Sequence, residues 1–272
     1  MPEAEELDRA LVRARFARAA ANYERAAALQ AEVQARLLER LELTTLEPRR
    51  ILDLGTGTGR ALKPLAEKYP ASEVLGADLA LPMLARARRH RFHWRRFRAA
   101  AARAEALPFA ARSFDLVFSN LMLQWCPQPD AVFVEARRVL GDRALLLFTS
   151  FGPDTLNELR AAWAEVDDRT HVNLFIDMHD LGDALMRAGF TEPVMDVEYV
   201  TLTYDNLREL MRDLKTIGAT NATAGRARGL TGRGRLAALE RAYERFRRDG
   251  RLPATYEVVY GTAWTPVTLP RR

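Results

Sequence analysis

Residues 50–78, which read RILDLGTGTGRALKPLAEKYPASEVLGAD, decide the fold. A short apolar run from Ile51 to Leu54 carries one acidic residue and breaks into the glycine-rich stretch 55–59, and a helical pattern starts near Arg60. A strand that ends in glycines and continues as a helix is typical of the nucleotide-binding turn of open α/β sheets. Glycines let the backbone approach a ligand closely and adopt positive φ angles. The stretch therefore predicts a ligand site at the carboxyl end of the first strand.

Two acidic residues indicate which ligand this turn binds. Asp78 ends a second apolar run, where a carboxylate can accept both hydroxyls of a ribose. Asp53 precedes the first glycine by two positions, where its charge would repel a pyrophosphate but suits a cationic amino-acid group. The glycines follow G-x-G-x-G rather than the G-x-G-x-x-G of dinucleotide sites. This pattern resembles motif I of the class I S-adenosylmethionine (SAM) methyltransferases, which implies SAM as cofactor and S-adenosylhomocysteine as product.

Two later motifs resemble the same class. Residues 104–109 read A-E-A-L-P-F, like the loop that contacts adenine, and residues 113–120 contain the F-D-L-V of a fourth-strand motif. The cofactor-binding residues that the resemblance implies are Asp53, Gly55 and Gly57 for the methionyl end, Asp78 for the ribose, Leu79 and Met83 for the adenine faces, Ala104 and Glu105 for the adenine edge, and Asn120 beside the methionyl group.

Composition limits the class of protein. The chain has 272 residues, of which 48% are hydrophobic and 28% charged, as in soluble globular proteins. No apolar run is long enough to span a bilayer, and the acidic N-terminus does not resemble a targeting peptide. A single cysteine, Cys126, excludes an internal disulfide and a multi-cysteine zinc site, so no metal site is expected. We expect a bacterial cytoplasmic enzyme with no membrane partner.

Basic residues are concentrated in two segments. Residues 86–98 contain seven arginines and no acidic residue, and residues 204–253 contain eleven arginines and one lysine against six acids. The chain as a whole has a net charge of only +5, so the rest of it is acidic. This distribution suggests a polyanionic partner, and a solvated arginine-rich helix face is the alternative.

The order of the elements predicts an α/β fold of class I methyltransferase type, with a Rossmann-like, mostly parallel sheet of seven strands. An N-terminal helical segment with a bend near residues 19–24 would cover the cofactor cleft, and about fifty residues separate the last two strands. The expected division is one methyltransferase domain over 1–272, with a helical flap at 7–43, a core at 50–203, a basic helical insertion at 204–253 and the last strand at 254–265.

A more specific resemblance covers roughly residues 12–265. It rests on F-A-R-A-A-A-N-Y from Phe16, F-G-P-D-T-L-N-E-L from Phe151, H-V-N-L-F-I-D-M-H-D-L-G-D from His171, L-M-R-D-L-K-T-I-G-A-T-N from Leu210, R-G-L-T-G-R-G-R-L from Arg228 and P-A-T-Y-E-V-V-Y-G from Pro253. These motifs resemble the BioC family of malonyl-[acyl-carrier protein] O-methyltransferases of biotin synthesis. Such an enzyme methylates the free carboxylate of a malonyl thioester.

The implied chemistry needs few catalytic groups. A carboxylate is already ionised at neutral pH and needs no general base. Catalysis would come from holding its oxygen in line with the methyl group and excluding water. Neutral hydrogen-bond donors suit this task because the charge of the carboxylate falls in the transition state. The candidate catalytic residues are Tyr23, Gln124, Trp125 and His171, each of which could instead be a packing or solvated residue.

The resemblance also implies an acidic acyl carrier protein as partner, docking on Arg226, Arg228, Arg233 and Arg235. Three alternatives stay open: a methyltransferase or hydroxylase acting in respiratory complex I assembly, an RNA methyltransferase and a non-enzymatic SAM-binding scaffold. The motifs D-M-H-D and R-G-L-T-G-R favour the BioC family over the first. The absence of an N-P-P-Y motif after the fourth strand makes a nucleic-acid partner the weaker interpretation.

Overall fold

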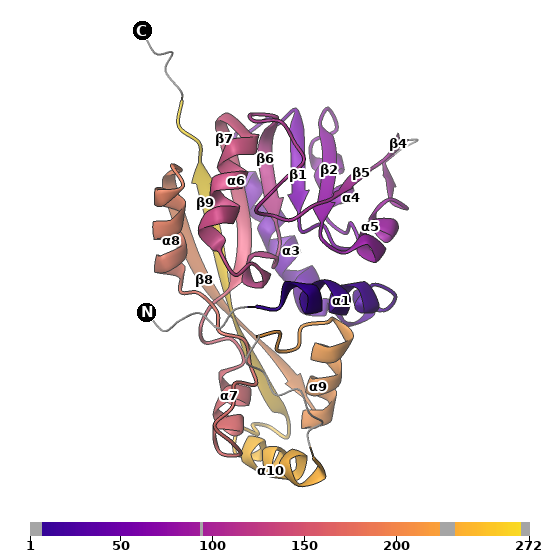
Figure 1. Ribbon diagram of the computed structural model, residues 1–272, viewed down its shortest axis with the longest axis vertical. Helices are drawn as coiled ribbons and strands as arrows, with labels where there is room; N and C mark the ends of the chain where they lie inside the picture. Colours follow the sequence, from indigo (N-terminus) through magenta and orange to yellow (C-terminus); the bar gives the residue numbers. More distant parts are fainter. Residues whose placement is uncertain (1–6, 93–94, 224–231, 268–272) are drawn as a thin grey trace.

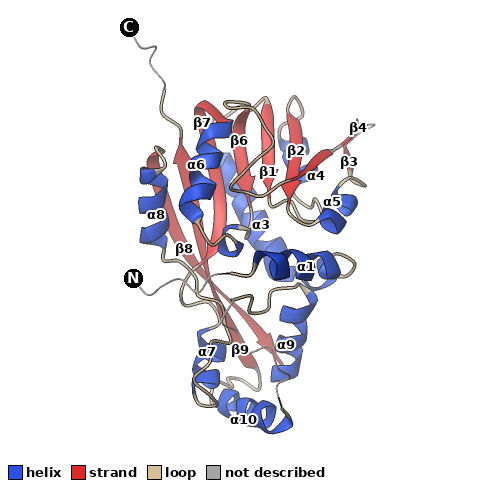
Figure 2. Ribbon diagram, in the orientation of Figure 1, coloured by secondary structure: helices blue, strands red, loops and turns tan. Residues whose placement is uncertain are grey.

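The computed structural model describes residues 7–92, 95–223 and 232–267. Its centre is a seven-stranded sheet in the order β5-β2-β1-β6-β7-β9-β8, in which only β9 runs antiparallel to its neighbours β7 and β8 (Figures 1 and 2). This arrangement confirms the predicted fold class. The strands are β1 (Arg50–Leu54), β2 (Glu73–Asp78), β5 (Arg98–Ala101), β6 (Phe114–Ser119), β7 (Leu140–Phe151), β8 (Thr191–Tyr204) and β9 (Leu252–Trp264), with β3 (Arg91–Phe92) and β4 (Arg95–Arg96) in a separate ribbon.

Alternating apolar residues bury both faces of the sheet. In β7, Leu145 and Leu147 belong to one hydrophobic cluster, and Leu146 and Phe148 belong to another. Side chains of successive strand residues point to opposite faces, so the two clusters are the two covered faces of the sheet. The helices are α1 (Arg9–Ala19), α2 (Tyr23–Ala26), α3 (Ala28–Arg40), α4 (Leu62–Lys68), α5 (Leu81–Ala87), α6 (Pro129–Val139), α7 (Asn157–Ala164), α8 (Met178–Arg187), α9 (Leu207–Thr216) and α10 (Arg233–Glu244), with 3₁₀ turns η1 (Leu41–Leu43) and η2 (Leu123–Trp125).

The predicted flap divides into two parts with different environments. Helix α1 lies across the carboxyl ends of the central strands (Figure 1), whereas α3 is buried on one face of the sheet through Val33 and Leu37, both fully buried. The bend predicted near residues 19–24 is present, and the short helix α2 follows it. The apolar stripe of α3 therefore belongs to the core, and the covering role falls to α1 and α2.

Several strands are longer than the sequence predicts. The run 144–149 predicts six residues of β7, but the strand extends over Leu140–Phe151, because Leu140 pairs with Phe114 of β6 and Phe151 pairs with Val258 of β9. β8 and β9 pair from Thr191 to Tyr204, well beyond the other strands, and α7, α9 and α10 gather around their far ends (Figure 2).

The insertion shares its packing with the sheet. Leu207, Leu239 and Tyr243 belong to the same hydrophobic cluster as Leu145 and Leu147. The insertion and the sheet thus share one hydrophobic cluster, as expected for the single domain that the sequence predicts. The division of the chain into domains stays a prediction. None of the helices in the described ranges has the length and apolar character needed to cross a membrane.

The contact between Gly261 and Phe148 provides a test of core packing. These residues are register partners on β9 and β7, and a Cβ added at Gly261 would lie 2.3 Å from Cζ of Phe148. We expect Gly261→Ala to destabilise the protein by about 1–3 kcal/mol through overpacking, measured by urea unfolding, and Phe148→Leu in that background to recover part of the loss. Gly182→Ala in α8 is the matched control, since its added Cβ meets only Met195 at 3.6 Å. Wild-type stability of Gly261→Ala would contradict this packing.

Candidate functional site

The glycine turn after β1 has the backbone that the sequence predicts. Gly55, Gly57 and Gly59 have φ angles of 78°, 53° and 86°. A Cβ at Gly55 would lie 2.3 Å from Cγ of Met122, and one at Gly59 would lie 2.8 Å from Cα of Ala87. Positive φ and close approach both exclude larger residues here. The turn is also fastened to β2, because the backbone N–H groups of Gly55 and Thr56 donate to the carbonyl of Ala77 at 2.8 and 3.0 Å.

Asp78 lies at the end of β2 and faces this turn. Its carboxylate accepts hydrogen bonds from the backbone N–H groups of Gly57, at 2.9 Å, and Ala80, at 2.7 Å. Burial raises the pKa of Asp78, and the backbone hydrogen bonds oppose that effect. The carboxylate is thus fixed in direction at the carboxyl edge of the sheet.

Asp53 lies inside β1 and is 2% exposed. The hydroxyl of Thr56 donates to its carboxylate at 2.5 Å. Burial raises the pKa of Asp53 to about 7. Its side chain lines a small cavity of about 50 Å³, together with Gln30 and Gln34 of α3 and Asn120.

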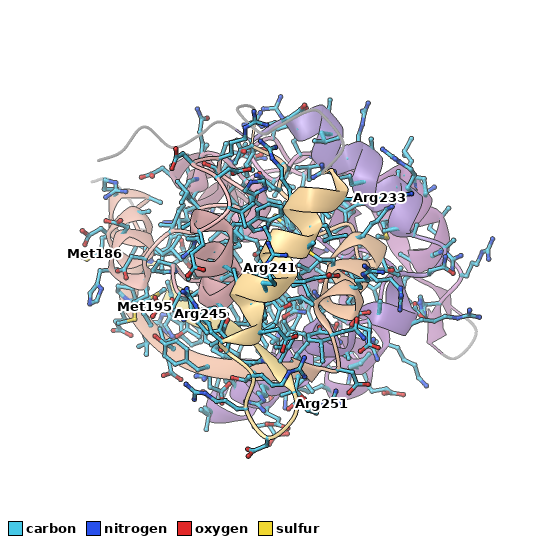
Figure 3. All side chains as sticks on the ribbon, turned by 90° about the horizontal axis from the view of Figure 1, so that it is seen from below. Met186, Met195, Arg233, Arg241, Arg245 and Arg251 are labelled. Atoms are coloured by element: carbon cyan, nitrogen blue, oxygen red, sulfur yellow. The ribbon has the colours of Figure 1, made fainter. Side chains whose placement is uncertain are left out.

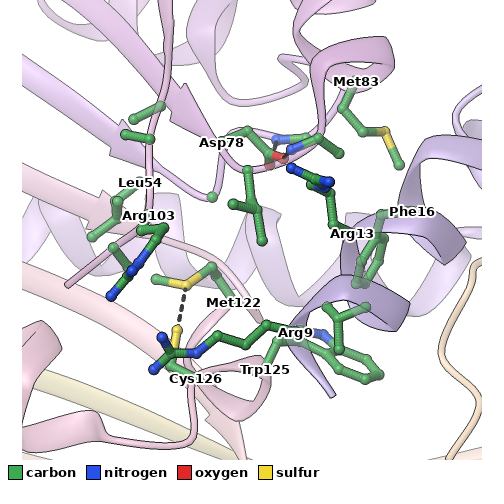
Figure 4. A pocket seen from close by; sticks show the side chains of 18 of the residues that line it. Arg9, Arg13, Phe16, Leu54, Asp78, Met83, Arg103, Met122, Trp125 and Cys126 are labelled. Carbon is green, nitrogen blue, oxygen red and sulfur yellow. Dashed lines mark hydrogen bonds between the residues drawn. The ribbon is translucent and has the colours of Figure 1, made fainter. Parts of the chain in front are cut away.

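A first cavity, of about 120 Å³, opens between the turn and α1. Figure 4 shows Arg9, Arg13 and Phe16 extending from α1, with Asp78 and Met122 on the sheet side. Eight of the nine residues predicted to bind the cofactor line this cavity, and the ninth, Asp53, lines the adjoining small one. The eight are Gly55, Gly57, Asp78, Leu79, Met83, Ala104, Glu105 and Asn120.

Polar and aromatic contacts hold α1 over the first cavity. Arg9 forms an ion pair with Glu105 at 2.9 Å, and the ring of Phe16 meets that of Trp125 edge-on at 5.2 Å. Tyr23 lines both the first and the small cavity. Burial, and then the charge of Asp78, raises the pKa of Tyr23 to about 12, so its hydroxyl stays a hydrogen-bond donor at neutral pH.

A second cavity, of about 520 Å³, adjoins the first, and Trp125 lines both. Its walls are aromatic and apolar on several sides, with Phe151, Trp163 and Tyr256 among them. The α9 helix and residues 217–221 close another side, so the insertion contributes directly to this cavity.

The four predicted catalytic residues do not all come together. Trp125 lies where the first and second cavities meet, Tyr23 lies on the side of the first, and His171 lines the second. Nε2 of His171 is 2.7 Å from Asp167, and its ring stacks on Trp163 with centroids 3.5 Å apart.

Gln124 requires a correction, because it lines none of the three cavities. Residues Leu123–Trp125 form a 3₁₀ turn, in which successive side chains point in different directions. The amide of Gln124 turns back and donates to the carbonyl of Leu121 at 2.7 Å. The sequence places this loop correctly but not the direction of Gln124.

Sequence reasoning missed two residues that line the second cavity, Gln30 and Arg15. Arg15 donates from Nη1 to the carbonyls of Thr220 and Asn221 at 2.8 and 2.6 Å, which ties α1 to the insertion. For Gln30 the available signal was a pair of glutamines, Gln30 and Gln34, four positions apart along the apolar stripe of α3. Within the described ranges no cluster of three or more His, Cys, Asp or Glu side chains is arranged to hold a metal ion.

The two basic segments can be located only in part. Arg226 and Arg228 lie outside the described residues. Arg233 and Arg235 lie in the first turn of α10, and both are exposed. Seen from below, Arg233, Arg241 and Arg245 lie along α10 (Figure 3).

Comparisons with known proteins agree with this geometry. A family profile described as "Methyltransferase domain" matches residues 52–148. The YcgJ protein of Bacillus subtilis superimposes with a TM-score of 0.61 at 14% identity, covering 88% of this chain and 100% of that one. Phosphoethanolamine N-methyltransferase 2 of Haemonchus contortus, solved with S-adenosyl-L-methionine, superimposes with a TM-score of 0.52 at 19% identity, covering 86% of this chain and 52% of that one. These likenesses show the fold.

Sequence relatives are much closer. The malonyl-[acyl-carrier protein] O-methyltransferase of Laribacter hongkongensis (strain HLHK9) is 54% identical over 280 residues, covering 100% of this chain and 94% of that protein. The protein of the same name from Gallionella capsiferriformans (strain ES-2) is 52% identical over 266 residues, covering 96% and 92%. Identity at this level over nearly the full length of both proteins confirms the predicted family. The chain belongs to the malonyl-[acyl-carrier protein] O-methyltransferase family.

Proposed function

We propose that this protein transfers the methyl group of SAM to the free carboxylate of a malonyl thioester carried by acyl carrier protein, an early step of biotin synthesis. The observation that carries the proposal is the pair of cavities that meet at Trp125. One is lined by eight of the nine residues that the resemblance implies for SAM, and the other is a larger space with aromatic and apolar walls, bordered by the insertion. A transfer between two bound molecules requires two such sites with a common boundary.

The residues of the first and small cavities fit SAM. Gly55 and Gly57 have no side chains, so a ligand in the small cavity can approach the backbone of the turn. In the same cavity, the carboxylate of Asp53 suits the ammonium group of the methionyl end. Asp78 keeps a directed carboxylate for the ribose hydroxyls. Leu79 and Met83, with Ala104 and Glu105, line the remainder, where the adenine would lie. Bound SAM would supply an electrophilic methyl group on a sulfonium centre.

The chain's own task is to align the acceptor and exclude water. A malonyl oxygen uses a lone pair to form the new bond to the methyl carbon, while the carbon–sulfur bond breaks and its electron pair stays on sulfur. No proton moves, so the protein needs no general base. Trp125 and Phe16 form an apolar wall at the junction of the cavities, which favours a reaction that neutralises two opposite charges.

The size and lining of the second cavity suit the phosphopantetheine arm of a carrier protein. Its apolar wall would contact the methylene and thioester parts, and polar residues in 170–173 and 219–221, which line the same cavity, would lie near the amide groups of the arm. The exposed Arg233 and Arg241 of α10 would meet the acidic surface of the carrier protein (Figure 3).

Methyl transfer is tested with radiolabelled SAM and malonyl-acyl carrier protein, with bulk tRNA and a complex I subunit peptide as parallel acceptors. We expect label on the carrier protein alone, removed by mild base as expected for a methyl ester. Label on tRNA or on the peptide, or SAM binding without transfer to any acceptor, would replace the proposal with the corresponding alternative.

The raised pKa of Asp53 predicts a pH-dependent affinity for SAM. Below pH 7 this carboxyl takes up a proton in the cofactor-free protein, because its pKa is about 7, and it then loses its attraction for the ammonium group. The affinity for SAM should therefore fall as the pH drops from 7.5 to 5.5. The steepest expected fall is about tenfold for each pH unit. Calorimetry of the wild type and of Asp53→Asn checks this, since the variant should bind SAM weakly with a flatter profile. Parallel profiles would exclude Asp53 as the titrating group.

Carrier-protein docking on α10 predicts a charge-dependent KM. Arg233 and Arg241 are exposed and form no ion pair with other described residues, so reversing them should leave the fold intact. We expect Arg233→Glu with Arg241→Glu to raise the KM for malonyl-acyl carrier protein roughly tenfold at low salt, and less at high salt, without changing the affinity for SAM.

The matched control reverses Arg49 and Arg143, which are exposed and lie outside both basic segments. Malonyl-pantetheine is the matched substrate, because it lacks the carrier protein and its KM should not respond to the α10 variant. Equal KM values for the α10 variant and the control would place the docking surface elsewhere.

A further inference from the structure

We propose that Gln30 binds the malonyl carboxylate and aligns its oxygen with the methyl group. The inference rests on the proposed function and assigns a group that neither the motifs nor the names of the relatives assign. Gln30 is in the first turn of α3 and lines both the second cavity and the small cavity next to Asp53. It therefore stands between the expected position of the acceptor and that of the methionyl end of SAM.

The side-chain amide of Gln30 is set for a ligand. Its Oε1 atom is buried and has no hydrogen-bond partner among the described residues. An amide oxygen only accepts hydrogen bonds, so the ligand group that suits Oε1 is a donor such as the ammonium group at the methionyl end of SAM. The amide also offers two N–H donors, which a carboxylate can accept.

The backbone of Gln30 is held rigidly at this boundary. Its carbonyl accepts a hydrogen bond from the amide of Asn120 at 3.0 Å. Asn120 in turn accepts from the hydroxyl of Thr149 at 2.9 Å, and that hydroxyl accepts from the N–H of Leu121 at 2.9 Å. Thr149 is fully buried in β7. The chain of bonds fixes the start of α3 to the ends of β6 and β7, where methyl transfer takes place under the proposed function.

A neutral donor suits the reaction better than the nearest cation. Arg15 also lines the second cavity, but its guanidinium donates to two backbone carbonyls of the insertion. A full charge would bind the ionised acceptor more tightly than the transition state, in which the carboxylate charge is being lost. Tyr23 does not line the second cavity. Gln30 therefore meets both requirements, because it is uncharged and it lines both the second cavity and the small cavity.

The experiment compares Gln30→Leu and Gln30→Glu with Gln34→Leu as the matched variant. Gln34 lies one turn further along α3 and lines only the small cavity. For each protein, calorimetry gives the affinity for SAM and steady-state assays give kcat and KM for malonyl-acyl carrier protein. We expect Gln30→Leu to keep the affinity for SAM within about threefold and to lose roughly a hundredfold in kcat/KM, as expected when one aligned donor is removed. Gln34→Leu should show the opposite result: its affinity for SAM should be weaker, and its loss of kcat/KM at saturating SAM should be smaller than that of Gln30→Leu.

The Gln30→Glu variant gives a readout that a structural role would not move. Its carboxylate should repel the acceptor at pH 8, and its activity relative to wild type should rise as pH falls and the added carboxyl regains a proton. Wild-type kcat/KM in Gln30→Leu, a loss of SAM affinity equal to the loss of kcat/KM, or a pH-independent ratio for Gln30→Glu would each overturn the assignment. Absence of transfer by the wild-type protein would instead overturn the proposed function.

Discussion

The fastening of the first strand-to-helix turn to the end of β2 is the constraint on which the site depends. Gly55 and Thr56 donate to Ala77, and Gly57 donates to the carboxylate of Asp78. The turn has positive-φ glycines at the alternate positions 55, 57 and 59, where the backbone can approach a ligand closely. Because both strands are parallel neighbours in the sheet, their carboxyl ends place the two acids, Asp53 and Asp78, on either side of one turn.

The second organising relation is the shared wall between the two cavities. Helix α1 lines the first cavity through Arg9 and Phe16, and Arg15 on the same helix lines the second. The helix is fixed to the insertion by three sets of contacts: the bridge between Leu7 and Thr223, the bond from the N–H of Asp8 to Ala222, and the bonds from Arg15. A segment that comes before the first strand and one that comes before the last strand thus form a single boundary around the site.

The sequence predicts well whatever depends on local pattern. The glycine turn and the acids at the ends of the first two strands follow from apolar runs and the glycines that end them, the sequence of elements predicts a mostly parallel sheet of seven strands, and the structure agrees. The full extent of β7 does not follow, because its first residue pairs with β6 and its last residue pairs with β9, and both are tertiary contacts. Polar residues on an amphipathic helix usually face solvent, so the glutamine pair beside the apolar stripe of α3 is an ambiguous local signal, and tertiary packing decides the inward position of Gln30.

The direction in which a side chain points was harder to predict than the loop or helix that carries it. Trp125 and Gln124 are neighbours in one loop, yet only the indole reaches the cavities, because a 3₁₀ turn rotates successive side chains apart. Arg15 and Thr220 are 205 positions apart, and only the folded chain shows that they are in contact.

That contact affects how the protein exchanges its ligands. α1 is bound by Arg9 to Glu105 beside the first cavity and by Arg15 to the insertion beside the second. Lifting α1 to open the first cavity therefore breaks contacts at both sites, whereas opening the second cavity at the insertion leaves the pair between Arg9 and Glu105 in place. The two cavities therefore share one helix, and a displacement of α1 that widens the first cavity also disturbs the wall of the second.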